Sequence, residues 1–294
     1  MLLRIEKMNV MYQAQVALDI TEPFQIDEGD RIGVIGSNGA GKSTLIRALV
    51  GLKSYEGHVE SHLRPQDMAV QMQFNQYPEG LTCKSIMERI LGTQIRKDPK
   101  LQKLIQYFEF EECLSKRYSK LSGGQKQRFT IILVMMQEAP LTFYDEVTSG
   151  LDFETRGSLM QKLNEWYENR RDALLIVSHY YEELERLADK LLILDHGHVI
   201  AYGEKRRLFH RYCGRAVIVL EDTQKNQQLI GEEHRIAAPR QYLAVSPQTE
   251  AQELALVGRL VQENISFRRS ECDIELLYMN AKKEYQEGVA NVSK

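Results

Sequence analysis

The chain has 294 residues and a formal net charge of −3, with 38 basic and 41 acidic side chains. Its length predicts one large domain together with a smaller one. Because basic and acidic residues nearly balance, the composition lacks the basic excess of a protein whose main partner is nucleic acid. We therefore expect no nucleic-acid partner.

Apolar runs are short throughout the sequence, as in residues 130–136 and 173–177. A helix needs about 20 mostly apolar residues to span a bilayer, so we expect that this chain does not cross a membrane by itself. The opening residues, MLLRIEKMNV, contain no apolar segment typical of a signal peptide. Four widely spaced cysteines predict reduced thiols in the cytosol: Cys83, Cys113, Cys213 and Cys272.

Residues 1 to about 35 have the pattern of strands and turns, and they end in the short apolar strand RIGVIG. A glycine-rich loop follows. After it, a predicted helix places Leu45, Ile46, Leu49 and Val50 on one side. From about residue 82 to 138 the pattern is helical.

The next part of the chain alternates strands with helices. LTFYDE and ALLIVSH predict buried strands, LMQKLNEWYEN and YYEELERLADK predict helices, and LLILDHGHVIAYGE predicts a hairpin. Such alternation is typical of a largely parallel α/β sheet, into which the helical middle is inserted.

The pattern changes after about residue 210. AVIVLED predicts a strand and TEAQELALVGRLVQENI a helix, so we expect a small separate α/β unit that ends in a polar tail. Its apolar positions would supply a core of its own: Val217, Val219, Leu254, Leu256, Leu260, Ile274 and Leu277.

The glycine-rich loop matches the phosphate-binding motif G-x-x-x-x-G-K-[ST] at residues 36–44. Glycines let several backbone N–H groups face one point at a helix N-terminus, where anions are favoured. The lysine adds a cation, and the hydroxyl of the next residue suits Mg²⁺. The expected nucleotide-binding residues of this loop are Gly36, Ser37, Asn38, Gly39, Ala40, Gly41, Lys42, Ser43 and Thr44.

Two further motifs lie downstream of this loop. Asp145 and Glu146 end a buried strand, where adjacent carboxylates are costly without a cation or a partner. Before them, the pentapeptide LSGGQ opens a predicted helix, and it comprises Leu121, Ser122, Gly123, Gly124 and Gln125. In this order and spacing, the motifs resemble those of the ABC ATPase family, over residues 1 to about 205.

The resemblance implies a fold and a domain organisation. The fold class would be α/β, a P-loop NTPase with a RecA-like core, an antiparallel β-subdomain and a helical subdomain over about residues 76–138. We expect the ABC ATPase domain at residues 1–210 and a small C-terminal α/β accessory domain at residues 211–294.

The resemblance also implies an ATP and Mg²⁺ site. Ser43, Asp145 and Gln73 would organise Mg²⁺, directly or through water. Gln73 matches the glutamine of the family's Q-loop, although Gln71 and Gln76 lie close by and leave the assignment open.

Four residues would act on the nucleotide itself. Lys42 would hold the phosphates, Glu146 would activate the attacking water, and His179 would sense the γ-phosphate. Tyr12 matches the aromatic residue that stacks on adenine, and a half-buried strand tyrosine is the alternative. Val147 stands where the family usually has proline, which leaves the fine positioning of the preceding glutamate open.

In the family, the LSGGQ signature contacts ATP that is bound to a second subunit. The resemblance therefore implies a head-to-tail pair of ATPase subunits, as a homodimer or a heterodimer. The segment after the catalytic glutamate matches the family's D-loop, with Ser149, Gly150, Leu151 and Asp152.

As a transport ATPase, the chain would work with multi-span membrane permease subunits on separate chains. It would then lie at the cytoplasmic face of the cell membrane, bound through the permease. One ATPase domain followed by a small C-terminal unit resembles bacterial drug, antibiotic and peptide exporters, which favours export. The alternative is a soluble ABC ATPase that acts on a partner such as an iron–sulfur assembly scaffold.

Overall fold

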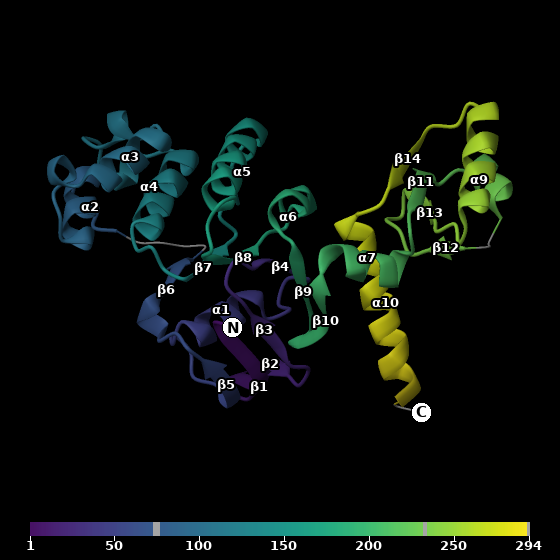
Figure 1. Ribbon diagram of the computed structural model, residues 1–294, viewed down its shortest axis with the longest axis horizontal. Helices are drawn as coiled ribbons and strands as arrows, with labels where there is room; N and C mark the ends of the chain where they lie inside the picture. Colours follow the sequence, from purple (N-terminus) through teal and green to yellow (C-terminus); the bar gives the residue numbers. More distant parts are fainter. Residues whose placement is uncertain (73–76, 232–233, 293–294) are drawn as a thin grey trace.

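The computed structural model describes residues 1–72, 77–231 and 234–292. Within these residues the chain forms three sheets with helices packed around them (Figure 1). In Figure 1 the central sheet lies between a helical part, residues 83–135, and a C-terminal part that begins at residue 205.

The N-terminal sheet is antiparallel, and its first strand pairs with the other three. Its strands are β1 (Leu3–Tyr12), β2 (Gln15–Ile20), β3 (Phe24–Ile26) and β5 (Glu56–Ser61). In β1 the side chains of Leu3, Ile5, Met8 and Val10 are buried, so the alternation slips by one residue after Ile5. The pairing with β5 shifts register at the same place, which keeps the apolar side chains on the core face.

The central sheet has the strand order β10-β9-β4-β8-β7-β6, and its neighbours are parallel except for β10 with β9. The strands are β4 (Arg31–Ile35), β6 (Met68–Gln71), β7 (Leu141–Asp145), β8 (Ala173–Val177), β9 (Lys190–Asp195) and β10 (His198–Glu204). Every residue of β7 and β8 is buried, as expected where helices or a second sheet cover both faces.

Alternate residues of the central strands face two apolar layers. Ile32, Phe143 and Leu175 belong to the layer shared with the N-terminal sheet and with α1 (Lys42–Leu49). Tyr144 and Ile176 belong to the opposite layer, which includes α4 (Gly123–Met135), α5 (Phe153–Tyr167) and α6 (Tyr181–Leu187). The largely parallel α/β architecture predicted from the sequence is confirmed.

The helical part consists of α2 (Cys83–Leu91), α3 (Pro99–Tyr107) and α4. Each helix begins after a residue whose side chain accepts a backbone N–H of the first turn, namely Thr82, Asp98 and Ser122. Three short 3₁₀ helices lie in the described part of this region, at Ile95–Lys97, Glu111–Cys113 and Tyr118–Lys120, and another, Pro65–Asp67, precedes β6.

The C-terminal part contains an antiparallel sheet of order β12-β13-β11-β14. Its elements are α7 (Lys205–Cys213), β11 (Val217–Glu221), α8 (Gln224–Ile230), β12 (Arg235–Ile236), β13 (Tyr242–Val245), α9 (Glu250–Gln262), β14 (Phe267–Ser270) and α10 (Ile274–Val292). The expected domain boundary after residue 210 falls inside α7. The segment expected as a polar tail continues α10 to Val292.

The two faces of the C-terminal sheet are buried in different cores. Ile218 and Leu220 form a separate core with α9, which contributes Leu256 and Leu260. Of the seven apolar positions expected to build that core, only these last two lie in it. Leu254 is 66% exposed. The other four, Val217, Val219, Ile274 and Leu277, belong to the main core on the helical side of the central sheet.

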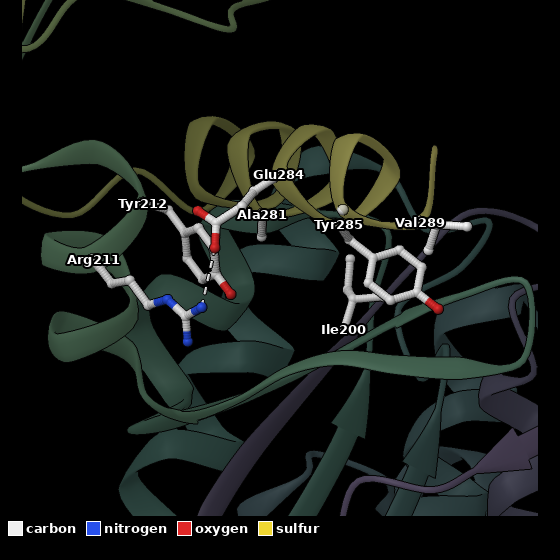
Figure 2. Close-up of a pocket in the computed structure, with 8 residues that line it drawn as sticks. Ile200, Arg211, Tyr212, Ala281, Glu284, Tyr285 and Val289 are labelled. Atoms are coloured by element: carbon white, nitrogen blue, oxygen red, sulfur yellow. Dashed lines mark hydrogen bonds and ion pairs between the residues drawn. The ribbon is translucent and has the colours of Figure 1, made fainter. Parts of the chain in front are cut away.

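Helix α10 packs against α6, α7 and β10 of the preceding part. Figure 2 shows α10 running along β10, with Arg211 of α7 paired to Glu284 of α10 at 3.0 Å. A cavity of about 380 Å³ lies between these elements, lined in part by Tyr212, Tyr285 and Ile200. The prediction of an independently packed unit was therefore wrong for this face of the C-terminal sheet. The face and α10 share the main core with the helices that cover the central sheet, because each apolar face must be buried against another element.

Within the described residues, no helix combines the length and the apolar character that crossing a bilayer requires.

Candidate nucleotide site

Three loops meet at the carboxyl-terminal edge of the central sheet. They follow β4, β7 and β8, which are neighbours or next neighbours in the sheet. A cavity of about 390 Å³ opens there, lined by Ala17, Asn38, Gly39, Ala40, Gly41, Lys42, Ser43, Thr44, Glu146 and His179. The fold thus brings the predicted phosphate loop together with two predicted catalytic residues that lie more than 100 positions further along the chain.

The phosphate loop needs glycine at the residue that precedes α1. Gly41 has a φ of 101°, and a Cβ atom there would lie 2.5 Å from a methyl carbon of Leu18 and 2.9 Å from the carbonyl oxygen of Ala17. A side chain would therefore clash as well as strain the backbone. The residue before α1, Gly41, has no side chain with which to cap the helix, and the first N–H groups of a helix are a favourable site for an anion.

The Lys42 side chain is folded back onto the loop. Its Nζ donates to the carbonyl oxygens of Gly36 at 2.7 Å and Ser37 at 3.1 Å. Burial lowers the pKa of Lys42 below its ordinary value, and the nearby carboxylates Glu146 and Asp145 partly oppose this. A lysine ammonium group that lines the cavity suits a phosphate ligand.

Asp145 ends β7 beneath the loop and is only 1% exposed. Burial raises the pKa of its carboxyl group, whereas the nearby Ser43 hydroxyl lowers it. Among the described residues, Oδ1 of Asp145 is buried without a hydrogen-bond partner. A buried carboxylate oxygen beside a hydroxyl is a donor set that fits Mg²⁺.

Glu146 and His179 contact each other across the site. His179 Nε2 lies 2.9 Å from Glu146 Oε1. Glu146 has a φ of 55°, a left-handed conformation that is costly for a residue with a side chain. Its N–H donates to the carbonyl oxygen of Val177 on β8 at 3.0 Å, which fixes the turn that leaves β7.

Tyr12, at the end of β1, is 40% exposed. The Lys53 ammonium group lies 4.3 Å from the centre of its ring. Hydrogen bonding by Arg47 and, to a smaller extent, by Thr44 lowers the pKa of the phenol, with burial acting in the opposite direction. Tyr12 thus lies next to the end of the phosphate loop, and its side chain is partly exposed.

The signature residues lie apart from this cavity, since none of Leu121 to Gln125 is among its described lining residues. Ser122 caps α4, and its Oγ accepts the N–H of Gln125 at 3.3 Å. The D-loop segment lies beside it. A Cβ on Gly123 would be 3.7 Å from Leu151, and Asp152 caps α5.

Gln73 and Gln76 lie outside the described residues. Gln71, the alternative candidate, ends β6 and is 1% exposed. Its Nε2 donates to Oε1 of Gln127 on α4. This glutamine therefore connects the central sheet to the signature helix.

Several residues near the site were not recognised in the sequence. Ala17 lines the cavity from β2, and Thr148, Ser178 and Glu183 form a buried polar cluster beneath the loops that carry Glu146 and His179. Thr148 and Ser178 stand next to motif residues, which is a signal that could have drawn attention to them. Ala17 carries no such signal, because only the packing of the N-terminal sheet brings it to the loop.

Comparison with known proteins places these features in a family. The family model for ABC transporters matches residues 22–149. A methionine import ATP-binding protein of Clostridium tetani is 30% identical over 220 residues, which cover 67% of this chain and 68% of that protein. A manganese transport system ATP-binding protein of Halalkalibacterium halodurans is 30% identical, with 68% of this chain and 85% of that protein covered. The chain belongs to the ABC transporter family of ATP-binding proteins.

Proteins that are named for export are also similar to this chain. A Nod factor export ATP-binding protein of Rhizobium sp. is 29% identical over 66% of this chain and 68% of that protein. A solved ATP-binding subunit of an ABC transporter is similar with a TM-score of 0.63 and 26% identity, over 73% of this chain and 95% of that one. The family and the P-loop fold predicted from the motifs are confirmed. This ABC protein is an ATP-binding and ATP-hydrolysing subunit for membrane transport.

Proposed function

We propose that the cavity at the edge of the central sheet is the ATP site, with roles distributed as the motifs suggest. The phosphate loop and Lys42 bind the β and γ phosphates, and the exposed ring of Tyr12 stacks on adenine. The single observation that carries this proposal is the convergence of Lys42, Glu146 and His179 on one cavity.

We further propose that Ser43 and Asp145 hold Mg²⁺, with Gln73 as a third contributor. When bound, the cation supplies charge neutralisation for the phosphates. Support comes from the buried carboxylate oxygen of Asp145, which among the described residues has no hydrogen-bond partner, and from the hydroxyl beside it.

Hydrolysis is proposed to depend on the pair formed by Glu146 and His179. The carboxylate of Glu146 accepts a proton from the attacking water and orients it. His179 holds this carboxylate through the 2.9 Å contact and faces the position of the γ-phosphate. Because both groups are supplied by loops at the ends of neighbouring parallel strands, their spacing is set by the sheet.

The signature is proposed to act on ATP bound to a second subunit, in a head-to-tail dimer. Residues 121–125 lie outside the chain's own cavity, and Ser122 at the N-terminus of α4 is exposed. A solved cassette that resembles this chain with a TM-score of 0.62 and 21% identity is described as a dimer. Its similarity supports the fold of the subunit.

Mixing two inactive variants tests the dimer and the site together. Glu146→Gln removes the base from its own site, and Ser122→Arg blocks the signature that serves the partner's site. In a mixed dimer, one site combines an intact Glu146 with an intact Ser122. We expect each variant alone to be inactive and the mixture to recover activity. A mixture as inactive as its components would contradict a site shared between subunits.

We also propose that separate multi-span permease subunits bind this ATPase at the cytoplasmic face of the membrane and that transport runs outward. The export relative supports this direction, and the import relatives support the opposite one at similar identity. Purification in detergent with the co-purifying membrane protein, followed by transport assays in inside-out vesicles, tests both points. ATP-dependent accumulation inside such vesicles indicates export, and ATP-dependent loss indicates import.

The domain assignment remains a proposal as well. We propose residues 1–210 as the ATPase domain, with the helical subdomain at about residues 76–138, and residues 211–294 as an accessory region. The residues that line the nucleotide cavity all precede residue 180, which supports the separation of chemistry from the accessory region.

A further inference from the structure

Glu183, on α6, is a buried carboxylate that lies between two loops of the site. Its residue is 5% exposed. A single oxygen, Oε2, accepts hydrogen bonds from the hydroxyls of Thr148 at 2.9 Å and Ser178 at 2.6 Å. Both donors are buried too, with Thr148 1% and Ser178 3% exposed. Two hydroxyls from distant parts of the sequence are therefore held at one atom.

The two donors belong to the loops that carry the proposed catalytic pair. Thr148 follows Glu146 by two residues, and Ser178 directly precedes His179. The side chains of Glu146 and His179 contact each other at 2.9 Å on the solvent side of the same loops. The loop of Glu146 and the loop of His179 are thus joined twice, by the contact between these two side chains and by the buried bonds of Glu183.

The charge of Glu183 is only partly compensated. Among the described residues its Oε1 is buried without a hydrogen bond, and the Nε of Arg156 lies 3.6 Å away. The Arg156 guanidinium is held over the ring of Tyr180 at 3.8 Å. Burial raises the pKa of Glu183, while Ser178, Thr148 and Arg156 lower it.

A buried ion pair of this kind contributes little net stability, because desolvation offsets the attraction. The main effect of Glu183 is instead on the position of the two loops. Since both hydroxyls bond the same oxygen, the distance between the two loops is defined within hydrogen-bond limits. Glu146, with its positive φ, needs surroundings that hold its turn in place.

We propose that Glu183 is a positioning residue for ATP hydrolysis, which holds the loop of Glu146 against the loop of His179 through Thr148 and Ser178. This inference rests on the proposed roles of Glu146 and His179. Glu183 does not touch the cavity itself, so it acts on the rate of the chemical step and not on the binding of ATP.

The test compares kcat with ATP affinity in four variants. Glu183→Ala is expected to lower kcat about 10- to 100-fold, because a shift of about 1 Å in a catalytic group can cost about a hundredfold. The KM for ATP should stay within about twofold, since the loss is confined to the transition state. Glu183→Gln keeps an oxygen that can accept from both hydroxyls, so its kcat is expected to fall less than that of Glu183→Ala.

Thr148→Val and Thr148→Ser form a matched pair that leaves the Glu183 side chain in place and changes only one of its two hydroxyl donors. Valine keeps the shape of threonine without its hydroxyl, whereas serine keeps the hydroxyl. We expect a fall in kcat for Thr148→Val and near-complete retention for Thr148→Ser. If Glu183→Ala does not fold, this pair decides the question.

Glu253→Ala provides a remote control. Glu253 is also a buried glutamate, 8% exposed, and it bonds Arg215 and Arg269 on the C-terminal sheet side. Its loss should lower stability without the selective loss of kcat.

Three outcomes would overturn the inference: wild-type kcat in Glu183→Ala and Thr148→Val, equal losses in Thr148→Val and Thr148→Ser, or a KM that rises as much as kcat falls. Glu146→Gln, measured in the same assay, distinguishes a failure of the positioning role from a failure of the proposed function. If Glu146→Gln turns over normally, the proposed function itself fails. If Glu146→Gln is inactive while the Glu183 and Thr148 variants behave like wild type, only the positioning role fails.

Discussion

The ammonium group of Lys282, on α10, lies 2.8 Å from Oδ1 of Asp195, which ends β9. Asp195 is only 3% exposed. Two residues further on, the N–H of Gly197 donates to the carbonyl oxygen of Ala40 in the phosphate loop at 3.2 Å. The last helix of the accessory region is therefore connected to the nucleotide site through a single hairpin.

Lys282→Met is predicted to lower stability at neutral pH. Breaking a fully buried pair costs about 3–5 kcal/mol, and because Lys282 is partly exposed we expect about 1–3 kcal/mol. We also expect a higher KM for ATP, since the hairpin supports the phosphate loop. Melting temperature and steady-state kinetics check the two effects. The neighbouring Lys283→Met serves as control, because its ammonium is exposed; equal effects of both substitutions would contradict the prediction.

The same pair predicts a pH dependence. Burial alone would raise the pKa of Asp195, but hydrogen bonds from Lys282 and His196 bring it below its ordinary value. The carboxylate thus adds stability above the unfolded pKa of about 3.9, and this stability is lost as the pH falls through the lower folded value. The difference in melting temperature between wild type and Lys282→Met should therefore be largest near neutral pH and shrink below about pH 4.

Glu146→Gln is predicted to retain ATP binding and to lose nearly all hydrolysis. The amide keeps the size of the side chain but cannot act as a base. Because ATP is then not consumed, an ATP-bound dimer should accumulate, which gel filtration with ATP and Mg²⁺ would detect. The exposed Glu168→Gln should behave like wild type. Normal turnover in Glu146→Gln would exclude Glu146 as the base.

Lys42→Ala is predicted to weaken ATP binding about 10- to 150-fold, since a hydrogen bond to a charged group contributes about 1.5–3 kcal/mol. The change removes the one side-chain cation that lines the described cavity. Equilibrium binding with a fluorescent ATP analogue measures the effect. Lys84→Ala, on the exposed side of α2, is the control. An unchanged affinity in Lys42→Ala would mean that phosphates bind elsewhere.

Tyr12→Ala is predicted to weaken ATP binding by about 1–3 kcal/mol, the usual cost of losing an aromatic ring that stacks on a base. Tyr12→Phe keeps the ring and should bind like wild type. The same binding assay, run with ATP and with inorganic triphosphate, separates base stacking from phosphate binding. A loss in Tyr12→Ala that is equal for both ligands would favour the alternative of a structural strand tyrosine.

Truncation after Arg211 is predicted to leave ATP binding and basal hydrolysis but to lower the melting temperature. No described residue beyond 211 lines the nucleotide cavity, whereas Leu208 and Phe209 lose the side chains of α10 that cover them. Truncation after Gly288, which removes only the end of α10, is the milder control. A folded protein without nucleotide binding after the longer truncation would show that the accessory region builds the site.

Most residues that line the proposed nucleotide cavity could be named from the sequence, because they lie in short contiguous motifs. The phosphate loop requires glycines and a lysine at fixed positions, since successive N–H groups and one cation must face the same point. Short runs with few charges, residues 141–145 and 173–177, indicated buried strands. Gln73, which lies outside the described residues, remains a prediction from motif order.

The contacts that join distant segments could not be predicted, and their physical reason is tertiary packing. Glu183 stands beside Glu182 near the start of a predicted helix. Nothing in that pattern indicates that two buried hydroxyls meet its carboxylate. Asp195 and Lys282 are separated by 87 positions and meet only because α10 closes the core that the C-terminal sheet shares with the central one. A local motif places groups along one segment, whereas the burial of apolar faces determines which segments, and therefore which charges, come together.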